Sequence, residues 1–271
     1  MDQVAATDTV RRARSCAVLP DTFGPGLLSE VIRIPNNYAA VLPYRTSADA
    51  LQALLPPGLA VAGEPVVSFR FRRAEGIDWS DSTSHFAGVT VTVDASCADG
   101  TTCRGMYFLI GWEDDAMAVV LGREVAGTVK LPASITLDRH AHGGDRCLVH
   151  HRGSPLLQIT CHKTAEISGD EFARLRAARR EGCTIGYKGL PAVDGRALGE
   201  RYLTAIPTTA EIDAAWQIAG EVTLFGTSAQ AVHWHHRVIQ ALRSLPLLSA
   251  LPGILTTGVN TLDLSQARRL T

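Results

Sequence analysis

The amino-acid sequence predicts an α+β protein, mainly β, built on a large antiparallel sheet that curls into a barrel with a few helices outside it. Two observations support this class. Segments with the alternating pattern of a half-buried strand outnumber segments with helical periodicity. The strand segments also follow one another directly, with turn residues between them, as in antiparallel sheets.

The expected strands, in order, are 37–44, 65–73, 87–96, 102–112, 134–140, 146–152, 155–164, 186–191, 197–208, 211–225 and 258–264. The clearest single strand is PVVSFRFRR, in which apolar and polar residues alternate with a period of two. Asp99-Gly100 suits the tight turn of a hairpin between 87–96 and 102–112. The polar stretch AEGIDWSDSTSH (74–85) predicts a loop.

Four helices are expected, at 48–55, 114–121, 168–180 and 229–245. Thr46 or Ser47 caps the first helix, and Ser168 caps the third, with Gly182 as its expected C-terminal glycine. We expect residues 1–30 to form a loosely ordered arm and residues 31–271 to form a single domain.

Composition narrows the possible partners. A net charge of -1 over 271 residues argues against a surface for nucleic acid or anionic membranes. The six cysteines include no C-x-x-C pair, which favours free thiols in a reducing compartment. Prolines interrupt the apolar segment 245–259, and no apolar run follows the first arginines. We therefore expect a cytoplasmic protein without a membrane span.

Lysine is scarce, because only three of the 26 basic residues are lysines: Lys130, Lys163 and Lys188. An arginine-rich coding bias would explain this as well as function would. Lys130 is the most informative position, since it lies between a glycine-containing turn and the apolar segment LPASITL. A buried lysine can lose its proton and attack a carbonyl, whereas arginine cannot form an imine.

Several short motifs occur in a characteristic order: YRT, PPGL, EPVVSFRF, GRE, then a lysine six residues after Glu124, YKGLP and VDG. This order, from about residue 36 to 264, resembles the acetoacetate decarboxylase superfamily. The resemblance implies a cone-shaped β-barrel around the active site and a symmetric homo-oligomer. It also implies that Lys130 forms an imine with a keto substrate, so that the enzyme needs no separate cofactor.

The chain departs from the family pattern at several positions. Leu131 replaces the second lysine of a Lys-Lys pair, and Asn37 replaces an arginine. Arg70 replaces a strand glutamate, while the loop glutamate has no certain counterpart beyond Asp81 or Ser82. Without an adjacent cation, burial has to make the amine neutral. Val129, Leu131, Pro132, Phe108 and Trp112 are the residues expected to build that apolar pocket.

These departures favour a carbon-carbon lyase of the aldolase-dehydratase type, which joins or splits a keto acid and an aldehyde. A β-keto acid decarboxylase and a non-catalytic small-molecule binding barrel remain alternatives. Arg70 could bind a keto-acid carboxylate bidentately, and Glu124, Trp112 and His235 are further candidates for substrate contact. We expect no metal, because the histidines around His235 lack acidic or cysteine partners at zinc spacing. The sequence also contains no phosphate-binding loop and no GxSxG motif.

Overall fold

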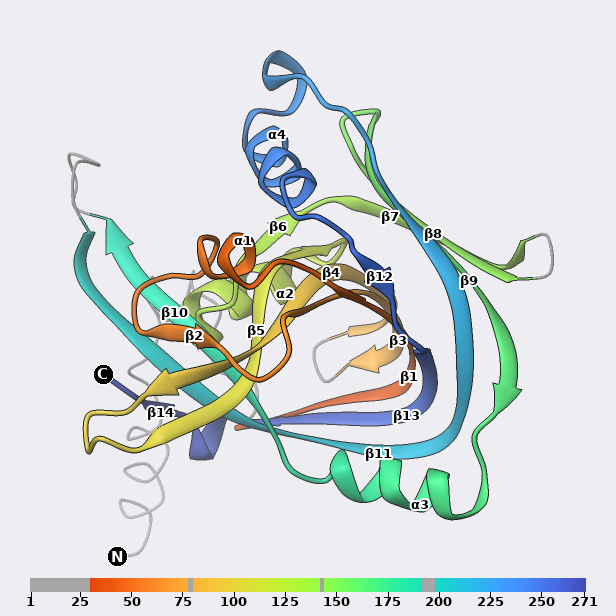
Figure 1. Cartoon of the computed structure of the whole chain (residues 1–271), viewed down its shortest axis with the longest axis horizontal. Coiled ribbons are helices and arrows are strands. Elements are labelled where there is room, and N and C mark those ends of the chain that lie inside the picture. The colour runs from red at the N-terminus through yellow and green to blue at the C-terminus, as the bar shows by residue number, and fades with distance from the viewer. Residues whose placement is uncertain (1–29, 78–79, 142–143, 192–197) are drawn as a thin grey trace, which may run out of the picture.

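The structure is a computed structural model that describes residues 30–77, 80–141, 144–191 and 198–271 (Figure 1). The strands are β1 (Val31–Arg45), β2 (Leu59–Val61), β3 (Val66–Ile77), β4 (Ser80–Ser96), β5 (Thr102–Glu113), β6 (Lys130–Pro132), β7 (Ser134–Ala141), β8 (Gly144–His151), β9 (Ser154–Glu166), β10 (Gly182–Pro191), β11 (Leu198–Leu224), β12 (Ser249–Ala250), β13 (Gly253–Asp263) and β14 (Arg268–Arg269). The helices are α1 (Ala48–Gln52), α2 (Ala116–Leu121), η1 (Gly122–Ala126), α3 (Gly169–Ala178), α4 (Ala229–Arg243) and η2 (Leu264–Gln266).

The predicted mainly β class is confirmed, because these strands form one 14-stranded sheet. Its main path runs β10-β5-β4-β3-β1-β13-β11-β9-β8-β7, and β10 also pairs with β11. The strands from β10 through β5 to β11 therefore form a closed ring, and β9, β8 and β7 continue the sheet beyond it. Two pairings, β10 with β5 and β5 with β6, are parallel, so the sheet is mixed and not wholly antiparallel.

The long strand β11 connects the ring to the rest of the sheet. Its first half pairs with β10, its middle with β13 and its last part with β9. In Figure 1 it runs along the lower side of the molecule and rises at the right, with α3 beneath it. The sequence predicted two strands, 197–208 and 211–225, in place of this one. A register shift between Ile212 and Ala214 lets the strand bend without breaking.

The predicted loop at 74–85 was wrong, because β3 and β4 extend through most of it as a hairpin. Ala74 pairs with Ser84 and Glu75 with Thr83. Ala74 and Ile77 pack with Ile32 and Ile34 in a small apolar cluster. Main-chain pairing and a few buried side chains thus make strands from a segment that is polar in composition.

The third predicted helix has different ends. Helix α3 ends at Ala178, with Arg179 as its C-cap. Gly182 is not the capping residue, since it is the first residue of β10 and pairs with Thr208. The predicted Asp194-Gly195 turn, the N-terminal arm up to residue 29 and Cys16 lie outside the described residues.

Strand β3 separates two environments. Val67, Phe69 and Phe71 are buried on one face, in the main core that also includes Ile239 and Leu242 of α4. Full burial of one such side chain contributes about 1.5–3 kcal/mol. The alternate residues Arg70 and Arg72 lie on the other face, which we call the polar face of β3. None of the helices in the described part of the chain is long and apolar enough to cross a membrane.

Candidate active site

Lys130 is the first residue of β6, and the sheet register fixes the direction of its side chain. Lys130 pairs with Gly111 of β5, Gly111 pairs with Gly88 of β4, and Gly88 pairs with Arg70 of β3. Residues paired across neighbouring strands point to the same side of a sheet. Lys130 and Arg70 therefore share the polar face, whereas Leu131 points to the opposite face.

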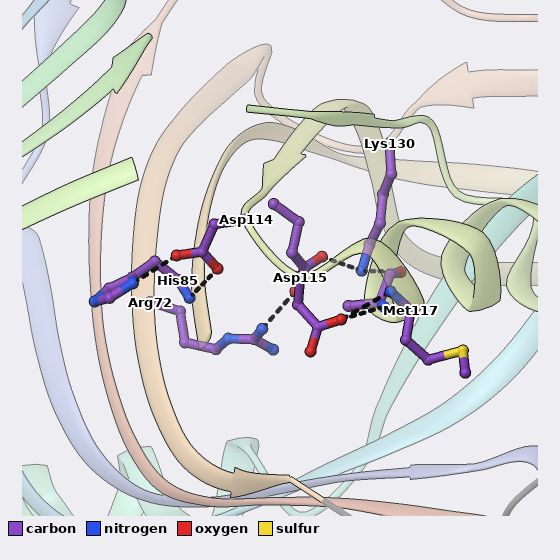
Figure 2. A network of polar contacts seen from close by, with 8 residues as sticks. Arg72, His85, Asp114, Asp115, Met117 and Lys130 are labelled. Carbon is purple, nitrogen blue, oxygen red and sulfur yellow. Dashed lines mark hydrogen bonds and ion pairs between the residues drawn. The ribbon is translucent and has the colours of Figure 1, made fainter. Parts of the chain in front are cut away.

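The Lys130 amine lies in a charged environment (Figure 2). It donates to the Glu113 carboxylate and, at 3.2 Å, to the carbonyl oxygen of Ala118. Arg72 Nη2 contacts the other oxygen of the Glu113 carboxylate at 2.7 Å. The Glu113 side chain has no exposed surface, while those of Arg72 and Lys130 are 15% and 16% exposed. We call these three residues the Arg72–Glu113–Lys130 cluster.

Helix α2 and the π-helical turn η1 hold this cluster. Asp115 caps α2 by accepting from the main-chain N–H groups of Met117 at 2.8 Å and Ala118 at 3.2 Å. Gly122, where α2 meets η1, lies against the Lys130 side chain. A Cβ atom on Gly122 would be 2.5 Å from Lys130 Cδ, so only glycine leaves room for the lysine there. This is a structural reason for the glycine of the GRE motif.

The prediction of the residues that form an apolar pocket around Lys130 was wrong. Leu131 and Trp112 pair with each other in the sheet and face the core, away from the amine. The apolar neighbour of the amine is Phe86, whose ring centroid is 5.9 Å from Nζ. Of the expected wall residues, Phe108 contributes indirectly, by packing edge-on against Phe86 with ring centroids 5.7 Å apart.

The cation that the sequence lacks beside Lys130 comes from another strand. Arg72 is far from Lys130 in sequence but shares the carboxylate of Glu113 with it. Sequence reasoning missed Arg72, Glu113 and Phe86 as neighbours of Lys130. A signal was present for Arg72, because it follows Arg70 by two residues in FRFRR and therefore lies on the same face of the strand.

Arg70 lies on the polar face and contacts the sulfur of Met106 on β5. Burial, together with the neighbouring cations Arg179 and Arg72, lowers the pKa of the Arg70 guanidinium to about 10. Among the described residues, no carboxylate contacts Arg70. An acidic ligand would therefore find a desolvated and unneutralised cation at this position.

The other predicted substrate contacts are not brought together with Lys130. Trp112 donates its indole N–H to Nδ1 of His235 at 3.1 Å, on the core side of the sheet. The ring of His151 lies 4.3 Å from that of His235. Burial and His151 lower the pKa of His235 to about 4, so this imidazole is neutral at pH 7. Trp112 and His235 are thus separated from the amine by the sheet.

Glu124 lies in η1, and its buried Oε2 atom has no hydrogen-bond partner among the described residues. Asn37, which stands where the family has an arginine, is also buried, and its Oδ1 atom likewise lacks a partner within that part of the chain. Arg123 acts as a brace, because it donates to the main-chain carbonyl of Lys130 at 3.0 Å. In the described residues, no group of three or more His, Cys, Asp or Glu could hold a metal ion.

This geometry defines a class of protein: a mainly β barrel that carries a charged cluster around a lysine on one face of its sheet. The family model described as Acetoacetate decarboxylase (ADC) matches residues 21–267, and the chain belongs to this family. A search of curated protein sequences finds no significant match.

Solved structures of the family have the same fold. An acetoacetate decarboxylase from Legionella pneumophila is 19% identical with a TM-score of 0.69, over 89% of this chain and 87% of that one. The enduracididine biosynthesis enzyme MppR, complexed with pyruvate, is 15% identical with a TM-score of 0.67, over 89% and 90%. An acetoacetate decarboxylase-like enzyme from Sphingomonas wittichii RW1 is 17% identical with a TM-score of 0.67, over 89% and 92%.

Proposed function

We propose that the protein is an enzyme that forms a Schiff base between Lys130 and a keto acid and acts as a carbon-carbon lyase of the aldolase-dehydratase type. The observation that carries the proposal is the pairing of the Lys130 amine with a carboxylate that Arg72 already neutralises. In this proposal the covalent imine takes the place of a cofactor. The substrates are a small keto acid and an aldehyde.

The charge balance of the cluster supports a reactive amine. Arg72 and Lys130 carry two positive charges against the single negative charge of Glu113. When Lys130 loses a proton, Arg72 and Glu113 remain as an ion pair, so the net charge of the cluster falls to zero. We infer that Arg72 is the cation of this cluster, in place of the second lysine of the family pattern.

In the first step the neutral amine attacks the ketone carbon, and the carbonyl oxygen takes up a proton. The carbinolamine then loses water and becomes the imine. Glu113 contacts Nζ and can exchange protons with it at each of these steps. The imine nitrogen then takes up a proton, and removal of a proton from the neighbouring carbon gives an enamine, which can attack an aldehyde.

Arg70 favours a lyase over a decarboxylase as the proposed function. Its guanidinium is desolvated, lies on the face of Lys130 and is a strong partner for a carboxylate. Such a contact retains the substrate carboxylate, whereas decarboxylation requires that the carboxylate leave as carbon dioxide. The solved structure of MppR with the condensation product of pyruvate and imidazole 4-carboxaldehyde supports this choice by analogy. Decarboxylation of a β-keto acid is the alternative, and the family match favours it.

Reductive trapping tests the proposal. The protein is incubated with pyruvate and sodium borohydride, then digested, and the modified peptide is located by mass spectrometry. We expect the adduct on Lys130. Lys163→Arg and Lys188→Arg are matched controls, since those lysines lie over the rings of Trp216 and Tyr202 and not in the cluster. An unmodified Lys130 would favour the non-catalytic binding barrel.

A second assay separates the two reactions. Pyruvate with an aromatic aldehyde is expected to give an unsaturated condensation product, which absorbs light at longer wavelength than either reactant. Acetoacetate is the matched test for decarboxylation, followed by release of carbon dioxide. Turnover of acetoacetate without any condensation would select the decarboxylase.

A further inference from the structure

The end of α3 brings a second arginine to the polar face. Phe172, Leu175 and Arg179 are spaced three and seven residues apart, so they lie on one side of the helix axis. Phe172 and Leu175 pack on the cluster of Ile167, Ile212 and Ala215, against which Ile254 of β13 also packs. The side of α3 that carries Arg179 is therefore the side that faces the sheet.

The register shows which face of the sheet α3 covers. Ile254 pairs with Val41 of β1, and Val41 pairs with Arg70 of β3. The three side chains therefore point to the same side. Helix α3 thus packs on the face that carries Arg70, and the main-chain carbonyl of Arg179 accepts from the N–H of Ala210 on β11 at 2.8 Å.

Arg179 lies close enough to Arg70 to influence it electrostatically, since it lowers the pKa of the Arg70 guanidinium. Burial lowers the pKa of Arg179, although the residue as a whole is exposed. No carboxylate contacts either guanidinium within the described segments. Arg72 differs from both, because Glu113 neutralises it. Two neighbouring cations on one face of the sheet, without a carboxylate partner in the described part of the chain, form a site for an anion.

We propose that Arg179 and Arg70 together form a binding subsite for two acidic groups, so that the preferred substrate is a keto acid with a second carboxylate. This inference rests on the proposed function for its reacting carbonyl. Arg70 binds the carboxylate next to the carbonyl, and Arg179 binds the distal one. Three strand spacings separate the Cα atoms of Lys130 and Arg70, roughly 14 Å. We place the substrate between these two side chains.

Equilibrium binding tests the subsite without requiring catalysis. Glutarate and butyrate, which contain no ketone, are titrated calorimetrically into wild-type protein and into Arg179→Gln at constant ionic strength. We expect wild type to bind glutarate at least about tenfold more tightly than butyrate, a factor that corresponds to about 1.4 kcal/mol. Arg179→Gln should lose this preference while its affinity for butyrate stays unchanged. Arg180→Gln, at the next position along the chain, is the control and should behave as wild type.

Each other outcome overturns the inference. If Arg179→Gln bound glutarate and butyrate more weakly by the same factor, one carboxylate would be using both arginines. An unchanged glutarate affinity would mean that Arg179 does not face the ligand, and equal binding of the two acids by wild type would mean that no second subsite exists. Circular dichroism and the melting temperature verify that Arg179→Gln is folded. If glutarate binds as expected but borohydride traps nothing on Lys130, the proposed reaction fails and the subsite stands.

Discussion

Glu113 connects Arg72 and Lys130 through a single carboxylate: Arg72 contacts Oε1 at 2.7 Å and Lys130 contacts Oε2. The three residues come from β3, β5 and β6, so the contact also joins three strands of the sheet. Because the Glu113 side chain is fully buried, its charge is balanced almost entirely by these two partners. Stability and the charge state of the amine are therefore coupled at this one residue.

Glu113→Gln should change both stability and reactivity. It leaves two cations near each other without an anion, and loss of one partner from a buried ionic contact costs about 3 kcal/mol. The same change removes the carboxylate that can exchange protons with Nζ, so borohydride trapping should be slower than in wild type. Urea denaturation measures the first effect, and the rate of adduct formation measures the second.

The matched control for this substitution is Glu64→Gln. Glu64 pairs with Arg45 at 3.1 Å, but the two side chains are 67% and 49% exposed. An exposed pair of this kind contributes between about 0 and 1 kcal/mol. Equal losses of stability in Glu113→Gln and Glu64→Gln would contradict the role assigned to Glu113.

Gly122→Ala should displace the amine without unfolding the protein. The main chain of Gly122 is helical, with φ -58° and ψ -45°, where alanine is favoured over glycine by up to about 1 kcal/mol. The new methyl group would meet Lys130 Cδ and Cε, which belong to a flexible side chain, and would lie 2.9 Å from Oγ1 of the buried Thr128, which would have to shift slightly. We expect a melting temperature close to that of wild type and adduct formation at least about tenfold slower, measured by quenched trapping. Trapping at the wild-type rate would show that the lysine does not need this space.

His235 predicts a pH dependence of stability. Its pKa falls from 6.5 in the unfolded chain to about 4 in the folded protein, because burial and His151 disfavour the charged form. Between these pH values the unfolded chain binds a proton that the folded protein excludes. The resulting contribution to the free energy of unfolding, up to about 3 kcal/mol, is fully present above pH 6.5 and is lost as pH falls towards 4.

The test of this effect compares His235→Gln with wild type over that pH range. Glutamine can still accept from the Trp112 indole but cannot titrate, so the acid-dependent loss of stability should become smaller by this amount. His233→Gln is the control, since His233 is exposed on the same helix. Parallel stability curves for wild type and His235→Gln would refute the prediction.

Local patterns were enough to predict the strands with strong alternation, such as β3 at Phe69 and Phe71, because alternation depends only on which residues are buried. The extension of β3 and β4 through Glu75 and Thr83 was not predictable in this way, since those residues form strands by pairing with each other. The parallel pairing of β10 with β5 was also invisible, because Thr184 and Met106 are distant in sequence.

The residues of the candidate site differ in the same way, because some could be predicted from local sequence and others depend on strand pairing. Lys130 could be selected from the sequence because lysine is rare and the family order of motifs leads to it. Its partners could not, since Glu113 approaches through the register of β5 with β6, and Arg72 approaches across β4. The sequence made His235 a candidate for substrate contact but did not predict that it would accept from the Trp112 indole in the core.

Cys103 and Cys183 should form a disulfide under oxidation. Their sulfur atoms are 3.9 Å apart across the place where β5 and β10 meet through only two register pairs, Thr184 with Met106 and Ile185 with Tyr107. Burial and Cys103 raise the pKa of Cys183 to about 12, so we expect slow reaction without a catalyst. Copper-phenanthroline should give the crosslink, identified by peptide mapping, and stabilise the fold by up to about 4 kcal/mol.

Cys103→Ser is the control for the crosslink and should show no increase in melting temperature after oxidation. Cys147 and Cys161 should stay reduced, because they occupy different pairs of the β8–β9 ladder, with Ile159 and Asp145 respectively. A disulfide that joins Cys97 to Cys103 would show that the seam between β5 and β10 is not the preferred site of oxidation.

Lys130→Arg separates the charge of Lys130 from its chemistry. Arginine can keep an ionic contact with Glu113, so the free energy of unfolding should change by less than about 1 kcal/mol. It cannot lose its proton or form an imine, so borohydride adducts and turnover should disappear. Lys163→Arg makes the same substitution outside the cluster and should retain both activities. An active Lys130→Arg enzyme would remove Lys130 from the mechanism, and the charged cluster would then have to be interpreted as a structural contact between β3, β5 and β6.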